Sequence, residues 1–206
     1  TLSGFSGSGT SYTATFTPTD NSTADGVVSV ASSKFSDAAG NANADGADAN
    51  NSVTMTVDTV EPTVSSAATA SGNSITLTLS EAVSGTPTAG DFTIGGVASN
   101  PTVSSVSVSG STVTLTLSAA MTDGDSPTVS YTQTSGYVND GVGNALEDFS
   151  NQAVTNNLDT TAPSIAITSD DSTLNVGDTA TITFTLSEAS TDFTAADVSV
   201  SGGTLS

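Results

Sequence analysis

Two copies of one short motif divide the chain and constrain its fold. Residues 57–62 read VDTVEP, and residues 158–163 read LDTTAP. Each copy ends a run in which apolar and hydroxyl residues alternate. Each also places a proline, which cannot donate a hydrogen bond to a sheet, before the next such run. The motif therefore predicts a strand, a short stiff linker and another strand. Its repetition predicts a tandem array of modules.

Three further motifs occur twice. They are ITLTLSEA at 75–82 and ITFTLSEA at 182–189, TAGDFTI at 88–94 and TAADVSV at 194–200, and NDGVGN at 139–144 and SDAAGN at 36–41. The first two pairs each follow a linker, whereas the third precedes one. Because residues 36–41 stand before the first linker, the second module is split into two parts that flank the first.

The two ends of the chain determine the phase of the repeat. Residues 204–206 restate residues 1–3, both reading TLS. Joined at this overlap, residues 160–206 followed by 4–57 make a module of almost the same length as residues 60–158. We therefore expect five segments: the C-terminal half of one domain at 1–57, a linker at 58–62, a complete domain at 63–158, a linker at 159–163 and the N-terminal half of a domain at 164–206.

Alternation with a period of two predicts an all-β fold. Hydrophobic residues make up 35% of the chain and aromatic residues 5%, but runs such as 113–117 (VTLTL) have the pattern of half-buried strands. Strands are expected near 12–16, 27–35, 53–57, 63–67, 74–79, 92–94, 101–108, 112–117, 128–132, 152–158, 164–168, 179–186 and 198–200. About seven short strands per domain predict β-sandwiches with essentially no helix.

The charge is strongly one-sided. The chain has 21 Asp and Glu residues, one Lys or Arg, no His and no Cys, and a formal net charge of −20. Such a chain cannot bind nucleic acid through phosphates, and metal cations are its natural partners. Without His or Cys, any metal site must use oxygen ligands, and catalysis would depend on carboxylates alone. We therefore expect no enzyme, and no apolar stretch approaches the length of a membrane helix.

The repeated motifs resemble the bacterial immunoglobulin-like repeats of giant extracellular adhesins and surface proteins. Residues 160–206 together with 1–57 are similar to the common adhesin repeat. Residues 60–158 are similar to the related SWM-type repeat of surface-motility proteins. The resemblance implies tandem Ig-like β-sandwiches in a secreted, cell-surface protein, where such modules act as spacers or build a fibre. The alternative is an Ig-like adhesion domain that itself binds glycan or protein.

The same motifs predict two clusters of acidic residues that bind calcium. In a seven-strand sandwich, the loops after the second strand and before the last lie at the end where the first strand begins. Two sets of residues should therefore converge: Asp58, Glu61, Glu81, Asp91, Asp140 and Asn144 at the first linker, and Asp159, Glu188, Asp197, Asp37 and Asn41 at the second. Calcium binds six to eight such oxygens, and the resemblance implies calcium at or near the linkers. The alternative is that the Asp-x-x-Gly-Asn motif is only a turn and the acids are solvated.

The split module predicts association between copies. A sandwich that lacks half its strands exposes unpaired edges and an open apolar face. We expect the halves to meet head to tail, either by covalent continuation in a longer array or by donation of strands between molecules. The contact would join two sets of residues, Ile182, Phe184 and Leu186 on one side and Phe16, Val28 and Val30 on the other.

Overall fold

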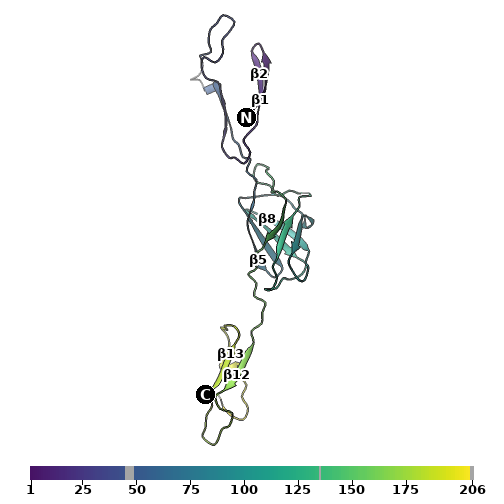
Figure 1. Cartoon of the computed structure of the whole chain (residues 1–206), viewed down its shortest axis with the longest axis vertical. Coiled ribbons are helices and arrows are strands. Elements are labelled where there is room, and N and C mark those ends of the chain that lie inside the picture. Colours follow the sequence, from purple (N-terminus) through teal and green to yellow (C-terminus); the bar gives the residue numbers. More distant parts are fainter. Residues whose placement is uncertain (45–48, 135, 205–206) are drawn as a thin grey trace. The chain divides into compact units, whose positions relative to one another are not determined.

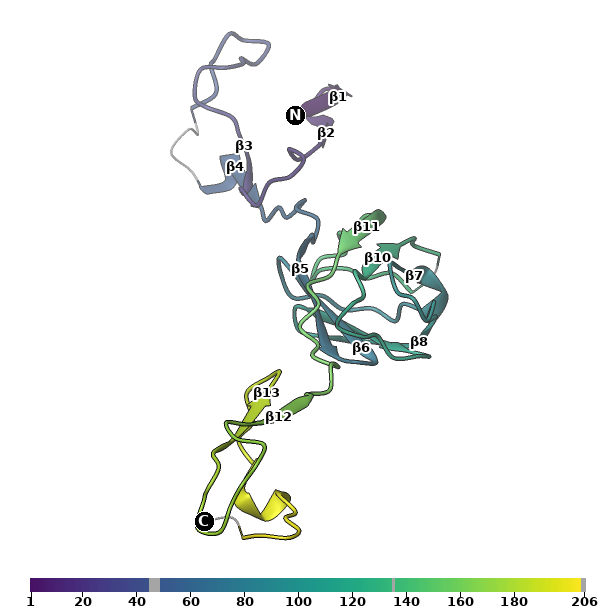
Figure 2. The same cartoon turned by 60° about the horizontal axis from the view of Figure 1, so that its bottom comes forward.

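The computed structural model describes residues 1–44, 49–134 and 136–204 (Figures 1 and 2). The chain divides into two compact units, Thr1–Leu158 and Asp159–Ser206, and each is considered by itself. Leu205 and Ser206, which carry part of the predicted overlap between the chain ends, lie outside the described residues. No helix in the described part of the chain is long and apolar enough to span a membrane.

The described residues of the intact domain form seven strands in two antiparallel sheets. They are β5 (Val64–Ser71), β6 (Ser74–Leu79), β7 (Phe92–Gly95), β8 (Val103–Ser109), β9 (Thr112–Leu117), β10 (Thr128–Tyr131) and β11 (Phe149–Ala153). One sheet has the order β5-β6-β9-β8, and the other has the order β11-β10-β7. Figure 2 shows β7, β10 and β11 together, apart from β5, β6 and β8. The predicted all-β sandwich is confirmed, and β6 and β9 have the predicted bounds.

Alternating side chains of the two sheets build one core. Ile75 and Leu77 of β6 are fully buried, as are Val113 and Leu115 of β9. Val129 of β10 belongs to the same cluster in the opposite sheet. Apolar side chains on one face of each sheet therefore meet between the layers, and the Thr residues between them lie on the other face.

The first unit also contains two separate strand pairs. One is β1 (Leu2–Ser8) with β2 (Ser11–Phe16), and the other is β3 (Gly26–Ser29) with β4 (Ser52–Met55), preceded by the 3₁₀ turn η1 (Ala49–Asn51). Strand β1 was not predicted, because its sequence LSGFSGS contains two glycines, which weaken the strand signal. The predicted strand at 27–35 is wrong in length, because β3 ends at Ser29.

In the described part of the second unit, β12 (Ile165–Ser169) and β13 (Ile182–Leu186) form a hairpin (Figure 1). The 3₁₀ turn η3 (Ala195–Asp197) follows. The predicted strand at 198–200 does not form, since a strand needs a neighbour to pair its backbone groups. None of the unit's described residues is buried.

The last strand of the intact domain also differs from its prediction near 152–158. Strand β11 lies at Phe149–Ala153, and Asn151 within it has a left-handed φ of 54°. The chain then leaves this sheet, and Thr155 makes a parallel bridge to Ala68 of β5. The last part of the domain therefore pairs with both sheets, β11 with β10 and Thr155 with β5.

Candidate metal site

Three carboxylates converge where the first linker meets the intact domain. Asp58 comes from the linker, Glu81 follows β6, and Asp140 precedes β11. One oxygen from each lies within 4.8 Å of the others. Asp140 is buried, and the other two are half-buried. Among the residues that the structure describes, this is the one acidic group of three or more with such spacing.

A tight turn holds Asp140 in place. Its Oδ1 accepts hydrogen bonds from the backbone N–H groups of Val142, Gly143 and Asn144 at 2.9, 2.7 and 2.8 Å. Gly143 has a φ of 104°, which favours glycine there. Burial raises the pKa of Asp140, but hydrogen bonds from the Asn144 side chain and the backbone outweigh it and hold that pKa below its ordinary value.

Asn144 joins this turn to the linker. Its Nδ2 donates to Asp140 Oδ2 at 2.7 Å and lies 3.2 Å from the carbonyl oxygens of both Asp58 and Val60. Asp58 Oδ1 in turn accepts a hydrogen bond from the Val60 N–H at 3.1 Å. The Asp-x-x-Gly-Asn motif is therefore a turn, and it also fixes the linker beside the carboxylates.

Glu81 experiences the repulsion within the group. Burial, followed by the charges of Asp140 and Asp58, raises its pKa. The one Lys or Arg of the chain is Lys34, so no basic residue of the intact domain can neutralise the three carboxylates. An all-oxygen set with uncompensated charge matches the ligand chemistry of calcium, which would take its remaining ligands from carbonyl groups and water.

Asp91 is not part of this group, although it was predicted to join it. It is buried, and both of its oxygens accept hydrogen bonds: from the Thr88 N–H at 2.6 Å, the Thr88 hydroxyl at 2.9 Å, and the backbone and hydroxyl of Thr134. These bonds outweigh burial and hold the pKa of Asp91 below its ordinary value. Its carboxylate stabilises the 3₁₀ turn η2 (Ala89–Asp91) through a capping box.

The same cap recurs at two other places. Asp197 Oδ2 accepts from the N–H and hydroxyl of Thr194 at 2.9 and 3.0 Å, and Asp125 Oδ2 accepts from those of Thr122 at 2.7 and 3.0 Å. The spacing Thr-x-x-Asp, which is a capping signature, could have identified this structural role from the sequence.

The remaining predicted ligands lie elsewhere. Glu61 lines a surface depression with Glu147 and Asp148 and does not join the group. Asp37 and Asn41, in the first unit, form the same turn as Asp140 and Asn144, with Asn41 Nδ2 2.9 Å from Asp37 Oδ2. Asp159, Glu188 and Asp197 belong to the second unit. Convergence at the second linker therefore stays a prediction.

The intact domain is thus a two-sheet, all-β sandwich with three carboxylates at its linker. The model of the bacterial Ig-like domain family matches residues 1–57 and 159–206. The model of the flagellar system-associated repeat, called the SWM repeat, matches residues 57–136. The chain belongs to the bacterial Ig-like domain family. Both resemblances expected from the sequence are thereby confirmed.

Solved structures of bacterial S-layer proteins are also similar. A crystal structure of the S-layer protein SbsC is 26% identical with a TM-score of 0.42, and the match covers 55% of this chain and 16% of that one. A crystal structure of the N-terminal part of SbsC is 24% identical with a TM-score of 0.40, and the match covers 54% of this chain and 26% of that one. The chain thus spans about a quarter or less of these structures. No curated protein matches the sequence.

Proposed function

We propose that this chain is a structural repeat module of a secreted, cell-surface protein, in which tandem Ig-like domains act as a spacer or build a fibre. One observation carries the proposal: a single Ig-like family model matches the two outer segments, 1–57 and 159–206, on either side of an intact sandwich. This pattern is typical of a tandem array of domains in which the two outer segments are parts of neighbouring repeats.

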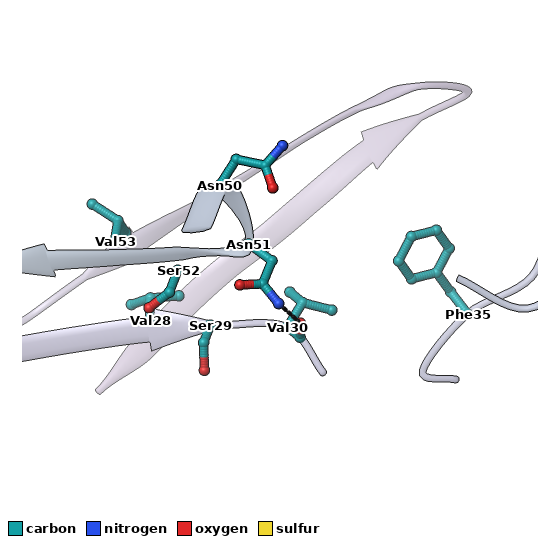
Figure 3. Close-up of a pocket in the computed structure, with 8 residues that line it drawn as sticks. All are labelled: Val28, Ser29, Val30, Phe35, Asn50, Asn51, Ser52 and Val53. Carbon is teal, nitrogen blue, oxygen red and sulfur yellow. Dashed lines mark hydrogen bonds between the residues drawn. The ribbon is translucent and has the colours of Figure 1, made fainter. Parts of the chain in front are cut away.

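The partner in this proposal is the complementary half of a neighbouring copy, joined head to tail. In their described residues, the outer segments contain only two-stranded sheets, which are marginally stable alone. Their apolar side chains are exposed: Val53 by 54%, Ile165 by 48% and Ile167 by 61%. Figure 3 shows the open hollow beside β3 and β4, lined by Val28, Val30, Phe35 and Val53 among others. Burial of these faces would drive association.

Sedimentation velocity across a range of concentrations tests this partner. The chain should form species larger than a monomer as concentration rises, and Ile167→Asp should shift it back to monomer. Tyr137→Asp is the matched control, because Tyr137 is also an exposed apolar residue, at 51%, but belongs to the intact domain and lies outside the turn of Asp140. A chain that stays monomeric throughout, or a control that disrupts association as strongly, would contradict association between separate chains.

Calcium is the proposed ligand of the group formed by Asp58, Glu81 and Asp140. An ion bound there would neutralise the repulsion and link the linker to two loops of the intact domain, which would stiffen the joint. An ion that binds only the folded state raises the free energy of unfolding by about 2.7 kcal/mol when the free ion is at a hundred times its Kd.

Thermal melting with calcium and with a chelator tests this ligand. Calcium should raise the melting temperature of the chain, and Glu81→Gln should remove most of that rise. Glu147→Gln makes the same charge change at an exposed position and should leave the rise intact. Equal melting temperatures with calcium and with chelator would show that the carboxylates bind no ion.

The counterpart of this group would be divided between two copies. Asp159 and Glu188 correspond to Asp58 and Glu81, and Asp37 corresponds to Asp140. In each unit the linker Asp accepts a backbone hydrogen bond two residues on, at 3.1 Å for Asp58 and 3.3 Å for Asp159. If the halves join head to tail, these acids belong to one domain, and calcium would also strengthen the contact between copies.

A further inference from the structure

We infer the register in which the halves of neighbouring copies join: β13 of one copy pairs antiparallel with β2 of the next, and residues 198–200 then become a strand beside β3. This inference rests on the proposed head-to-tail association and adds the strands and residue pairs that make it. The intact domain supplies the template, because each strand pair in the outer segments reproduces one of its own.

The hairpin of the second unit reproduces β5 and β6. Ile165 pairs with Leu186 as Val64 pairs with Leu79. A side-chain bond next to this pair is also repeated: Ser187 Oγ accepts from the Ser164 N–H at 2.9 Å, as Ser80 Oγ accepts from the Thr63 N–H at 3.0 Å. Strands β12 and β13 are therefore the first two strands of a sandwich.

The first hairpin of the chain reproduces β8 and β9. Both hairpins have a two-residue loop that begins with a left-handed glycine, Gly9 at φ 63° and Gly110 at φ 56°. At their open ends, Leu2 pairs with Phe16, and Val103 pairs with Leu117. Counting from the loop, each residue of β2 matches one of β9, so that Tyr12 corresponds to Val113, Thr13 to Thr114 and Ala14 to Leu115.

The pair β3 and β4 reproduces β10 and β11. The following turn repeats as well, because Ser36 bridges Ala42 as Asn139 bridges Ala145. The residues at one contact between β2 and β3 have sizes that compensate for each other. A side chain on Gly26, the counterpart of Val129, would collide with the ring of Phe16, which replaces the smaller Leu117. The larger residue on β2 is therefore compensated by the missing side chain on β3.

Each half presents the edge that the other lacks. In the intact domain β6 pairs with β9, with Ile75 opposite Leu115 and Leu77 opposite Val113, and all four are fully buried. Strand β13 pairs only with β12, and β2 only with β1, among the described residues. The template predicts three contacts between copies: Ile182 opposite Ala14, Thr183 opposite Thr13, and Phe184 opposite Tyr12.

This pairing explains the exposed aromatic residues of the first hairpin. Tyr12 is 55% exposed and stacks on Phe5, which is 71% exposed, with ring centroids 5.6 Å apart. An exposed aromatic pair would otherwise suggest a platform for a glycan. In the assembled domain, however, Tyr12 occupies the place of the fully buried Val113. These rings are therefore assigned to the core that the two copies share.

Residues 198–200 are ready to extend the opposite sheet. In the intact domain η2 leads into β7, which pairs with β10. In the second unit η3 leads into Val198, which has extended φ and ψ of −101° and 122°, close to the −118° and 138° of Phe92. The strand is missing because its neighbour, the equivalent of β10, is β3 of another copy.

Disulfide trapping tests the register, since the chain has no cysteine. Two single-cysteine chains with different tags, Thr13→Cys and Thr183→Cys, are mixed and oxidised. Both positions are exposed and predicted to be cross-strand neighbours, at a separation that suits a disulfide. We expect several times more heterodimer than from Thr15→Cys mixed with Thr183→Cys, because Thr15 lies two residues out of register on the same face.

The outcomes separate this inference from the association on which it rests. Preferential coupling of the Thr13 and Thr183 variants supports the register. Equal coupling of both mixtures, or a preference for the Thr15 variant, overturns the register while the cysteine-free chain still associates in sedimentation. Failure of that chain to associate overturns both. As a second readout, amide exchange at residues 198–200 should slow as concentration rises, and unchanged exchange in the associated protein would overturn the assignment of that strand.

Discussion

Glu81 and Asp140 contribute to the same acidic group, yet their pKa values shift in opposite directions. The Asp140 carboxylate accepts three backbone bonds and one from the Asn144 side chain, which stabilise its charged form. For Glu81, burial and its two acidic neighbours dominate. The Asp140 carboxylate therefore stabilises its loop. The charge of Glu81, in contrast, lowers the stability of the folded domain when no cation is bound.

Glu81→Gln should raise the melting temperature of the chain at neutral pH when calcium is chelated. The pKa of Glu81 is raised above 4.5 in the folded state, so its deprotonation lowers stability as pH rises through that pKa. The advantage of the variant should therefore shrink as the pH falls below the raised pKa. Melting curves in chelator from pH 4 to 8 measure this, with Glu147→Gln as control. A variant that is less stable than the wild-type chain at pH 7 would refute the repulsion.

Asp91→Ala should lower the free energy of unfolding of the intact domain by about 2–4 kcal/mol at pH 7, because it removes the charge-assisted hydrogen bonds of a buried carboxylate. The pKa of Asp91 is below 3.8 in the folded state. Its contribution is thus present above the unfolded value and lost as pH falls through the folded one. Urea unfolding at pH 7 and pH 3 measures both effects. A variant with wild-type stability would show that the cap is dispensable.

At the scale of elements, hairpins repeat more faithfully than their sequences do. Strands β8 and β9 were predicted from the alternation of their residues. Strand β1 forms the same kind of hairpin with β2 although its residues show little alternation. The turn glycine and the partner strand therefore determine this hairpin more than the propensity of β1.

Gly110→Ala should destabilise the intact domain by about 1 kcal/mol, because alanine resists a left-handed φ. There is open space around Gly110, so the cost comes from the backbone alone. Gly124→Ala is the matched control, because it also has open space and no left-handed φ. Urea unfolding of the two variants should separate them, and equal stabilities would contradict this role of the turn.

At the scale of the whole molecule, the order of segments along the chain decides whether the second sandwich can close within one copy. The intact domain has a continuous core, and the second unit has no buried residue in its described part. A rearranged chain in which residues 58–206 are followed by 4–57 places all seven strand segments of the divided domain in sequence.

This rearranged chain should be monomeric at concentrations where the natural order associates. It should also show more strand content by circular dichroism, because residues 198–200 gain their neighbour within the same molecule. Sedimentation and circular dichroism at matched concentrations measure both properties. A rearranged chain that associates as strongly as the natural one would show that the two outer segments do not complete each other.

Much of this protein follows from its sequence alone. Local alternation and spacing along the sequence were enough to predict the all-β class, the strands β6 and β9 and the repeated linkers. The same local patterns carried the resemblance to bacterial Ig-like repeats. The three carboxylates Asp58, Glu81 and Asp140 were also predicted, because the topology of a sandwich brings these loops to one end.

Tertiary structure decided which of the predicted acids face one another. Asp91 is an acidic residue close in sequence to Glu81, but its carboxylate accepts hydrogen bonds from Thr88 and Thr134 instead of joining the acidic group. Thr134 is distant in sequence, so only the folded chain reveals this contact. Likewise, residues 198–200 alternate like a strand but lack a neighbour in the second unit. A strand requires a partner for its hydrogen bonds, and its own sequence does not specify whether that partner is present.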